Sequence, residues 1–450
     1  MSIFVSLPTL SGRRHAAPGR IGLLLGGLIA WLVTAAPLRA AALEPTSRGN
    51  RPAVNLNPNI SVVVDGIYYH EQGDEPVRHL LEELEGFGHV HGGDDHAHGH
   101  DHAHGFEEGF NLRHLELMFA ADVDPYFKGW AIVAVEEHGA ELEEAVIQTT
   151  GLPGGLQLKL GKFFSDFSRQ NAMHAHEWNF VDLPLINQLL LGDHGLNEKG
   201  VQLSWLAPTP FFLTLGLEVL QGDNENLFAY VAEEEDPLPE RDDPRVFLGW
   251  AKVAPLLRGA HAVQLGLFGA RGVHQEAHLG PDGADDPGSH WLDGHQTLAG
   301  ADIVYRYTPP TAYGHHWLTL EGGYLFREKD IELLAHNNPE RAPLLGNSLI
   351  SKQDGLYVQG TYGFLPRWRA GLRGEVVGLT NSDRKPDGAT ESHDPSYRAS
   401  AMIDWTLTEF SRLRLQVNRG EYETHEGREA VTEGFVQAVF SLGAHGAHRF

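Results

Sequence analysis

Two neighbouring segments near the C-terminus, 396–408 and 412–418, alternate polar and apolar side chains almost without interruption. A period of two is typical of a β-strand with one apolar and one polar face. About sixteen segments along the chain tolerate the same pattern and predict an all-β fold. They lie near 60–69, 110–122, 127–136, 143–150, 156–164, 200–206, 211–221, 245–254, 261–271, 296–308, 316–327, 352–364, 367–380, 396–408, 411–422 and 430–442.

The predicted connections between these segments alternate in length. Tight turns, most of them with Pro or Gly, form the second, fourth, sixth, twelfth and fourteenth connections, at 123–125, 151–155, 206–210, 365–366 and 409–410. Most odd-numbered connections are long and acidic. Loop lengths sorted by parity are typical of a transmembrane antiparallel β-barrel, whereas a soluble sandwich has no reason to sort them. We therefore expect a barrel of about sixteen strands over 60–450, with long external loops and short periplasmic turns.

An export signal precedes the predicted barrel. Arg13, Arg14 and Arg20 stand before the apolar run 21–36, and three alanines at 40–42 follow it. This order predicts a secretory signal peptide over 1–42, which leaves 43–59 as an N-terminal periplasmic segment. An uncleaved helical anchor is disfavoured, because the apolar run is shorter than the about 18 to 20 residues that span a bilayer. Signal and barrel together predict the outer membrane of a Gram-negative bacterium.

Composition narrows the possible partners. The chain has no cysteine, which excludes a lipoprotein anchor, disulfides and thiolate metal sites. The formal charge of −26 becomes −30 when the four arginines of the signal are removed. Such an acidic surface argues against nucleic acid and for loops that attract cations. We expect outer-membrane lipid, metal ions and small solutes as partners, and a homotrimer is left open.

The faces of the predicted strands indicate a polar lumen. In 396–408 the lipid side reads Tyr, Ala, Ala, Ile, Trp and Leu at the odd positions 397–407, and the even positions are mostly polar. In 367–376 the inward side carries Arg367, Arg369, Arg373 and Glu375. Charges enclosed in a dry interior would cost several kcal/mol each if left unpaired, so we expect a hydrated lumen.

The chain resembles Gram-negative porins in its signal peptide, its alternating loop lengths, its terminal Phe450 and its opening segment 57–62. It also resembles porin-like proteins labelled zinc-regulated, TonB-dependent outer-membrane receptors, in the segment from 160–164 through 180–184 and in the ending 441–448. That label implies energy-coupled uptake. The sequence has no N-terminal plug-sized domain and no coupling box, which favours passive diffusion.

The first external loop, within 70–109, is rich in histidine. Its seven histidines between 89 and 104 interleave with carboxylates, a composition that suits Zn²⁺ and other borderline divalent cations. A merely solvated polar loop is the alternative. The predicted metal ligands are His89, His91, His96, His98, His100, His102 and His104, together with His174 and His176 of the third loop. We expect weak, exchanging binding and no required cofactor.

The third external loop, 165–199, combines acids and histidines with large apolar residues such as Trp178 and Phe180. Exposing so much apolar surface is costly, so we expect this loop to fold into the barrel, as the third loop of porins does. Its charges would then face arginines of the C-terminal strands and set ion preference. The predicted constriction residues are Asp166, Arg169, Glu177, Asp182, Asp193, Arg306, Arg369, Arg373, Arg398, Arg412 and Arg414.

The sequence thus predicts a passive, weakly cation-preferring channel for small hydrophilic solutes, with zinc capture by the histidine-rich loop. Two alternatives stay open: a general or anion-selective porin without a metal role, and an outer-membrane barrel enzyme. No nucleophile motif, phosphate loop or dinucleotide fingerprint supports an enzyme. His445 and His448 could contact metal at the periplasmic exit or simply lie at the interface.

Overall fold

The computed structural model describes residues 58–87, 106–136, 139–224, 226–227, 237–239, 244–279, 284–310 and 315–443. The predicted signal peptide, the histidines at 89–104 and the pair His445 and His448 lie outside these residues.

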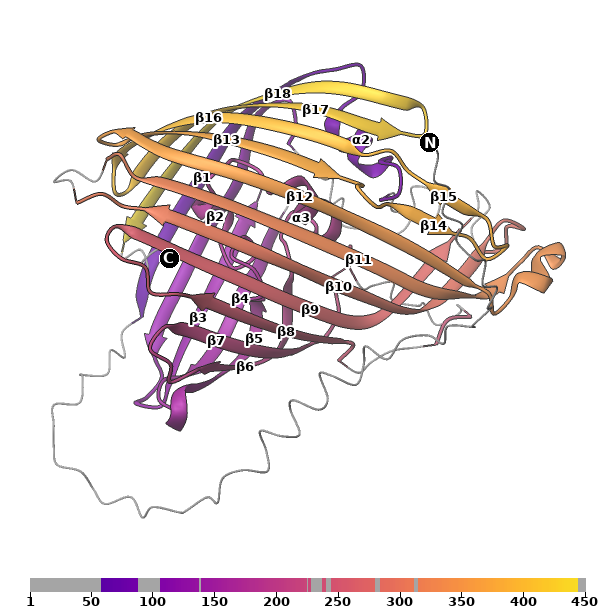
Figure 1. Cartoon of the computed structure of the whole chain (residues 1–450), viewed down its shortest axis with the longest axis horizontal. Helices are drawn as coiled ribbons and strands as arrows, with labels where there is room; N and C mark the ends of the chain where they lie inside the picture. The colour runs from indigo at the N-terminus through magenta and orange to yellow at the C-terminus, as the bar shows by residue number, and fades with distance from the viewer. Residues whose placement is uncertain are drawn as a thin grey trace, which may run out of the picture. The chain divides into compact units, whose positions relative to one another are not determined.

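Sixteen strands form a closed antiparallel barrel, in which each strand pairs with the next and β1 pairs with β18 (Figure 1). They are β1 (Asn59–Gln72), β2 (Gly109–Asp122), β3 (Phe127–Glu136), β4 (Gly139–Thr149), β5 (Leu156–Phe164), β6 (Asn197–Leu206), β7 (Phe212–Leu220), β8 (Val246–Ala254), β9 (His261–His278), β10 (His290–Tyr307), β11 (Leu318–His336), β12 (Ser348–Leu365), β13 (Trp368–Val377), β16 (Ser396–Thr408), β17 (Ser411–Thr424) and β18 (Gly427–Gly443). Closure leaves each of these sixteen strands paired on both sides, as a lipid environment requires.

Shorter elements occupy the connections. Strands β14 (Ser382–Arg384) and β15 (Thr390–Ser392) form a hairpin between β13 and β16. Helix α2 (Val77–Glu82) follows β1, and α3 (Leu185–Leu191) lies between β5 and β6. Short 3₁₀ helices span Pro153–Gly155, Ala175–Glu177 and Pro339–Leu344. No helix among the described residues is long and apolar enough to cross a bilayer.

The sixteen predicted segments correspond one to one to the barrel strands. Strands β9 to β12 run further than predicted, for example to His336 in β11 where the pattern suggested an end near 327. The extension places exposed Asp330 and Glu332 on the outer face. Because a lipid-facing strand carries apolar residues at its outward positions, these two charges ended the predicted segment. The backbone pairing of β11 nevertheless continues beyond the apolar part of the strand.

Loop lengths mostly follow the predicted parity. One end of the barrel carries short turns, at 123–126, 207–211, 366–367 and 409–410. Strand β1 begins at this same end, which we call the short-turn end. At the opposite end, β3 and β4 are separated by two residues and so are β17 and β18, which the sequence pattern did not predict for the long-loop side.

Arg367, expected to face inward, is an exposed turn residue with a φ of 68°.

Apolar side chains cover the outside of the barrel. Leu372, Leu267 and Val417 are 70%, 64% and 53% exposed, and each lies on the outward face of an alternating strand. Near the short-turn end Trp368 and Trp405 stack with ring centroids 5.5 Å apart. Outward aliphatic residues bounded by aromatic rings are the pattern of a barrel in a lipid bilayer. The predicted faces of 396–408 are confirmed, because its even positions from 396 to 404 are buried and its odd positions from 397 to 405 exposed.

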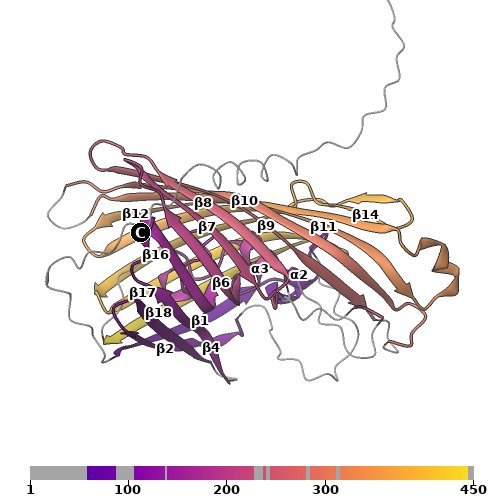
Figure 2. The same cartoon turned by 90° about the horizontal axis from the view of Figure 1, so that it is seen from below.

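The interior differs from the expected open, hydrated lumen. Helices α2 and α3 pack with inward-facing strand residues in one apolar cluster, which includes Leu80, Leu190 and Phe268. Figure 2 labels both helices. The sequence predicted that the loop carrying α3 folds into the barrel, but it placed the segment that carries α2 in an external loop and therefore missed its share of this core. Because α2 and α3 fill this part of the interior with apolar side chains, water occupies only the rest of the barrel.

A charge in the outer apolar belt should destabilise the barrel. We expect Leu372→Arg to cost about 2–4 kcal/mol, because it places a guanidinium against lipid. Leu334→Arg is the matched control, since Leu334 is exposed on the extension of β11 beside Glu332. Urea unfolding from lipid vesicles measures both. Equal stability of the two variants would contradict the lipid-facing assignment.

Candidate functional site: a loop inside the barrel lumen

The loop between β5 and β6, residues 165–196, turns into the barrel. Phe167, Leu185 and Leu190 are fully buried in the interior cluster, because exposing them to water would cost hydrophobic free energy. Helix α3 contacts β11, β12 and β13. The cartoon accordingly draws α3 within the ring of strands (Figures 1 and 2).

Asn171 fastens the two ends of this loop to each other. Its Nδ2 donates to the carbonyl oxygens of Ser165 and Leu196 at 2.9 and 3.0 Å, and its Oδ1 accepts from Leu196 N at 2.7 Å. The nearby Gly195 has a φ of 65°, a conformation that a side chain would oppose. Asn171 therefore holds residues 165 and 196, the two ends of the loop, close together beside β5 and β6.

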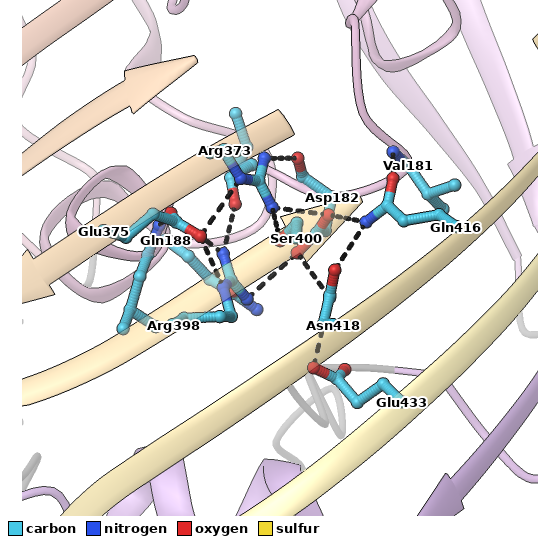
Figure 3. A network of polar contacts seen from close by, with 12 residues as sticks. Val181, Asp182, Gln188, Arg373, Glu375, Arg398, Ser400, Gln416, Asn418 and Glu433 are labelled. Carbon is cyan, nitrogen blue, oxygen red and sulfur yellow. Dashed lines mark hydrogen bonds and ion pairs between the residues drawn. The ribbon is translucent and has the colours of Figure 1, made fainter. Parts of the chain in front are cut away.

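Asp182 is the centre of a buried ion-pair network between the loop and the wall (Figure 3). Its Oδ1 lies 2.7 Å from Arg373 Nη2, and its Oδ2 lies 2.9 Å from Arg398 Nη1. Both arginines also pair with Glu375, at 3.0 and 2.7 Å. Burial raises the pKa of Asp182, but the two guanidinium groups more than offset this and hold the pKa well below its usual value.

Wall arginines also bind the backbone of the loop. Arg412 and Arg414 donate to the carbonyl oxygens of His176 and Trp178 at 2.6 and 2.9 Å. Arg398 donates to the Leu183 carbonyl at 2.8 Å. These bonds replace the backbone partners that an irregular segment would otherwise take from water. Arginines on adjacent strands thus hold one extended stretch of the loop against the wall.

The remaining predicted constriction residues lie on different sides of the loop. Arg369 contacts Asp404 at 2.6 Å and Asn179 at 3.0 Å. Arg169 contacts Glu321 at 3.4 Å, so here the loop supplies the cation and the wall the acid. Asp166 pairs with Lys159 at 2.7 Å, Asp193 accepts from Gln188 near the end of α3, and Glu177 accepts from His174 N.

This arrangement differs from the expected opposition of loop acids and wall arginines across an open gap. Asp182 is the loop acid that pairs with wall arginines, namely Arg373 and Arg398. Most of the predicted wall arginines bind carbonyl oxygens of the loop. The sequence named the charged side chains. It could not show that Gln416, whose Nε2 donates to Asp182 Oδ1 at 2.6 Å, and several carbonyl groups complete the network, or that Asn171 closes the base of the loop, because these partners carry no distinctive pattern.

An open cavity of about 370 Å³ lies below the loop, at the short-turn end of the barrel. Met173, His176 and Asn179 form part of its lining, and Glu409 and Phe410 of the β16–β17 turn stand at its rim. We call this cavity the vestibule. Its charged lining residues are Arg169, Arg306, Arg369, Arg412, Glu177, Glu321 and Glu409.

His174 and His176, predicted as metal ligands, meet carboxylates of the barrel wall. His176 Nδ1 lies 3.0 Å from Glu116 Oε1, and His174 Nδ1 lies 3.4 Å from Glu143 Oε2. Burial lowers the pKa of His174, but Glu143 and Glu144 more than offset this and hold the pKa well above its usual value. The sequence analysis missed the wall partners, although Glu116 occupies an inward position of the alternating strand β2.

The ion pair of Asp182 makes a prediction about pH. Because its folded-state pKa is lowered, Asp182 stabilises the loop above the ordinary aspartate range, and this stability is lost only as pH falls through the lowered value. A spin label on A175C, in a chain without native cysteine, should therefore stay immobile from pH 7 to 4.

Asp182→Asn should make the spin label mobile from pH 7 to 4. Breaking the buried ion pair should also lower the free energy of unfolding by about 3–5 kcal/mol. Asp193→Asn, at the end of α3, is the control and should leave the label immobile. Mobility of the unsubstituted loop already at pH 5 would contradict the assigned anchor.

Comparison with known proteins gives one relative by sequence. No family model matches the chain. An uncharacterized protein of Aquifex aeolicus (strain VF5) is 34% identical over 400 residues, which span 87% of this chain and 80% of that protein.

Solved structures similar to the chain are outer-membrane proteins. The outer membrane channel DcaP of Acinetobacter baumannii is 13% identical, with a TM-score of 0.49 over 86% of this chain and 96% of that chain. OmpT of Vibrio cholerae is 11% identical, with a TM-score of 0.48 over 86% and 97%. The anion-selective porin from Comamonas acidovorans is 10% identical, with a TM-score of 0.48 over 86% and 99%. At these identities the likeness does not extend to function.

Proposed function

The chain belongs to the same family as the Aquifex aeolicus protein, and from its own lumen we propose that it is an outer-membrane channel for small hydrophilic solutes. The observation that carries this proposal is a closed barrel with an apolar outer belt and a loop anchored across its interior. A protein built only to span the membrane needs no polar vestibule of about 370 Å³ beneath such a loop.

The charges of the vestibule bear on selectivity. Four arginines and three carboxylates line it, whereas the protein as a whole is strongly acidic. An acidic exterior concentrates cations near the mouth, and a slight excess of arginine favours anions at the wall. We propose weak net selectivity, with cations slightly preferred, as the sequence predicts. The vestibule arginines support anion selectivity as the second candidate.

Planar bilayers with a salt gradient test both candidates. Purified protein should produce stepwise conductance with a reversal potential close to zero. Arg306→Gln should shift that potential toward cation preference, because it removes a positive charge from the vestibule. Lys385→Gln is the control, since it removes the same charge from an exposed position on the loop between β14 and β15. Absence of conductance steps would contradict the channel, and a strong anion preference would favour the second candidate.

We also propose that the histidine-rich segment captures zinc for passage through this channel. The support is compositional, since seven histidines fall between 89 and 104 beside several aspartates. Imidazole must be neutral to bind metal, so capture should operate near pH 7.5 and fail as pH falls through about 6.5.

Deleting 89–104 should slow growth under zinc limitation, and added zinc should restore it. Conductance in metal-free buffer should not change. Equal growth of the deletion strain and the parent would exclude zinc capture and leave a general channel.

A further inference from the structure

A cluster of histidines and carboxylates lies where the inward loop meets strands β2 and β4. His114 and Glu116 project from β2, Glu143 and Glu144 from β4, and His174 and His176 from the loop. The side chains of His114, Glu116 and His176 are 8%, 4% and 8% exposed. Six potential ligands from three separate parts of the chain therefore meet in a nearly dry site.

The spacing of the innermost atoms suits a metal ion. His114 Nε2 and His176 Nδ1 lie 2.9 and 3.0 Å from the same oxygen of Glu116. The ligand atoms of these three residues all lie within 4.8 Å of one another. A tetrahedral ion with bonds of about 2.0–2.2 Å holds its ligands about 3.4 Å apart, so small side-chain adjustments would suffice.

Several polar atoms of the cluster lack hydrogen bonds. His114 Nε2, Glu143 Oε2 and His174 Nδ1 are buried without a hydrogen-bond partner among the described residues. Buried polar groups are normally paired, and exceptions require a reason. Three neighbouring carboxylates are also costly to bury together unless a cation accompanies them. Protonated imidazoles would supply positive charge and ion pairs, at 2.9 Å between His114 Nε2 and Glu116 and at 3.4 Å between His174 Nδ1 and Glu143 Oε2, but no well-directed hydrogen bond at these atoms. A divalent cation would supply both the charge and directed bonds.

We propose that this cluster binds one divalent transition-metal cation through His114, Glu116 and His176. Two imidazoles and one carboxylate are a ligand set that zinc sites use with an open fourth position. His174 Nδ1 lies 3.9 Å from Glu116 Oε2 and 3.4 Å from Glu143 Oε2, so His174 and Glu143 would flank the ion.

The position of the ion follows from its ligands. Glu116 and His114 belong to the wall, His176 belongs to the loop, and His176 also lines the vestibule. The ion would thus join the loop to β2, which is separated from β16 by β1, β18 and β17, and solutes in the vestibule would reach it. The carbonyl of His176 is already fixed by Arg412, so only the ring has to adjust.

Zinc binding in detergent tests this site without requiring conduction. The parent is the full-length chain with glutamine in place of the seven histidines at 89–104, which removes competing ligands. Equilibrium dialysis should find one tightly bound Zn²⁺ per chain. Co²⁺ in its place should give the visible absorption of an imidazole-ligated ion, which loosely associated cobalt would not.

His176→Gln and Glu116→Gln should each raise the dissociation constant of Zn²⁺ at least tenfold. His194→Gln is the matched control, because His194 is an exposed histidine of the same loop and stands outside the cluster. Far-ultraviolet circular dichroism checks that each variant keeps its β-structure. Equal affinity of His176→Gln and His194→Gln, or no stoichiometric zinc in the parent, would overturn the proposal.

The inference deepens the proposed channel but can fail separately from it. A protein that conducts and does not bind zinc would contradict only the metal site. A protein that binds zinc and does not conduct would contradict only the channel.

Discussion

The attachment of the inward loop to the arginines of the wall is the interaction on which the lumen depends. Arg373 and Arg398 are buried on the inside of β13 and β16, where an unpaired guanidinium would be costly. Asp182 and Glu375 neutralise them, and the loop carbonyls take their remaining donors. The loop therefore stabilises the buried arginines of the wall, and these arginines in turn hold the loop inside the barrel.

This mutual dependence divides the interior. Apolar residues of α2 and α3 fill the part near the long loops, and the vestibule lies near the short turns. The polar network around Asp182 lies within the inward stretch of the loop, close to the start of α3. In the proposed channel a solute that enters from one end would have to pass the loop, so the anchors of the loop would set the width of the passage.

The alternation of single strands predicted much of the barrel. In 396–408 the odd positions from 397 to 405 are exposed on the outside as expected, because the same periodicity governs a strand wherever it pairs. The extension of β11 past 327 was missed, since charged Asp330 and Glu332 end the lipid-facing pattern although pairing continues to His336.

The site was harder to predict. The sequence named Asp182, Arg373 and Arg398, which meet in the structure, because charged residues in a lumen stand out. It did not name Asn171, or the pairing of His176 with Glu116, because contacts across 60 residues depend on how the loop folds. An apolar loop implies burial somewhere, but only the folded chain shows against which strands.

Cross-linking the loop to the wall in outer membranes tests the central claim, that residues 165–196 lie inside the barrel. A Cβ at Gly355 of β12 would lie 2.8 Å from the Cβ of Ile186, so the loop and β12 must move apart by about 1 Å to reach the about 3.8 Å of a disulfide. The native chain has no cysteine, so the double variant I186C and G355C carries the only thiols. Mild oxidation should join them within one chain and leave either single variant unchanged. Two free thiols in the double variant, with the one at 186 open to a membrane-impermeant reagent, would contradict a loop inside the lumen.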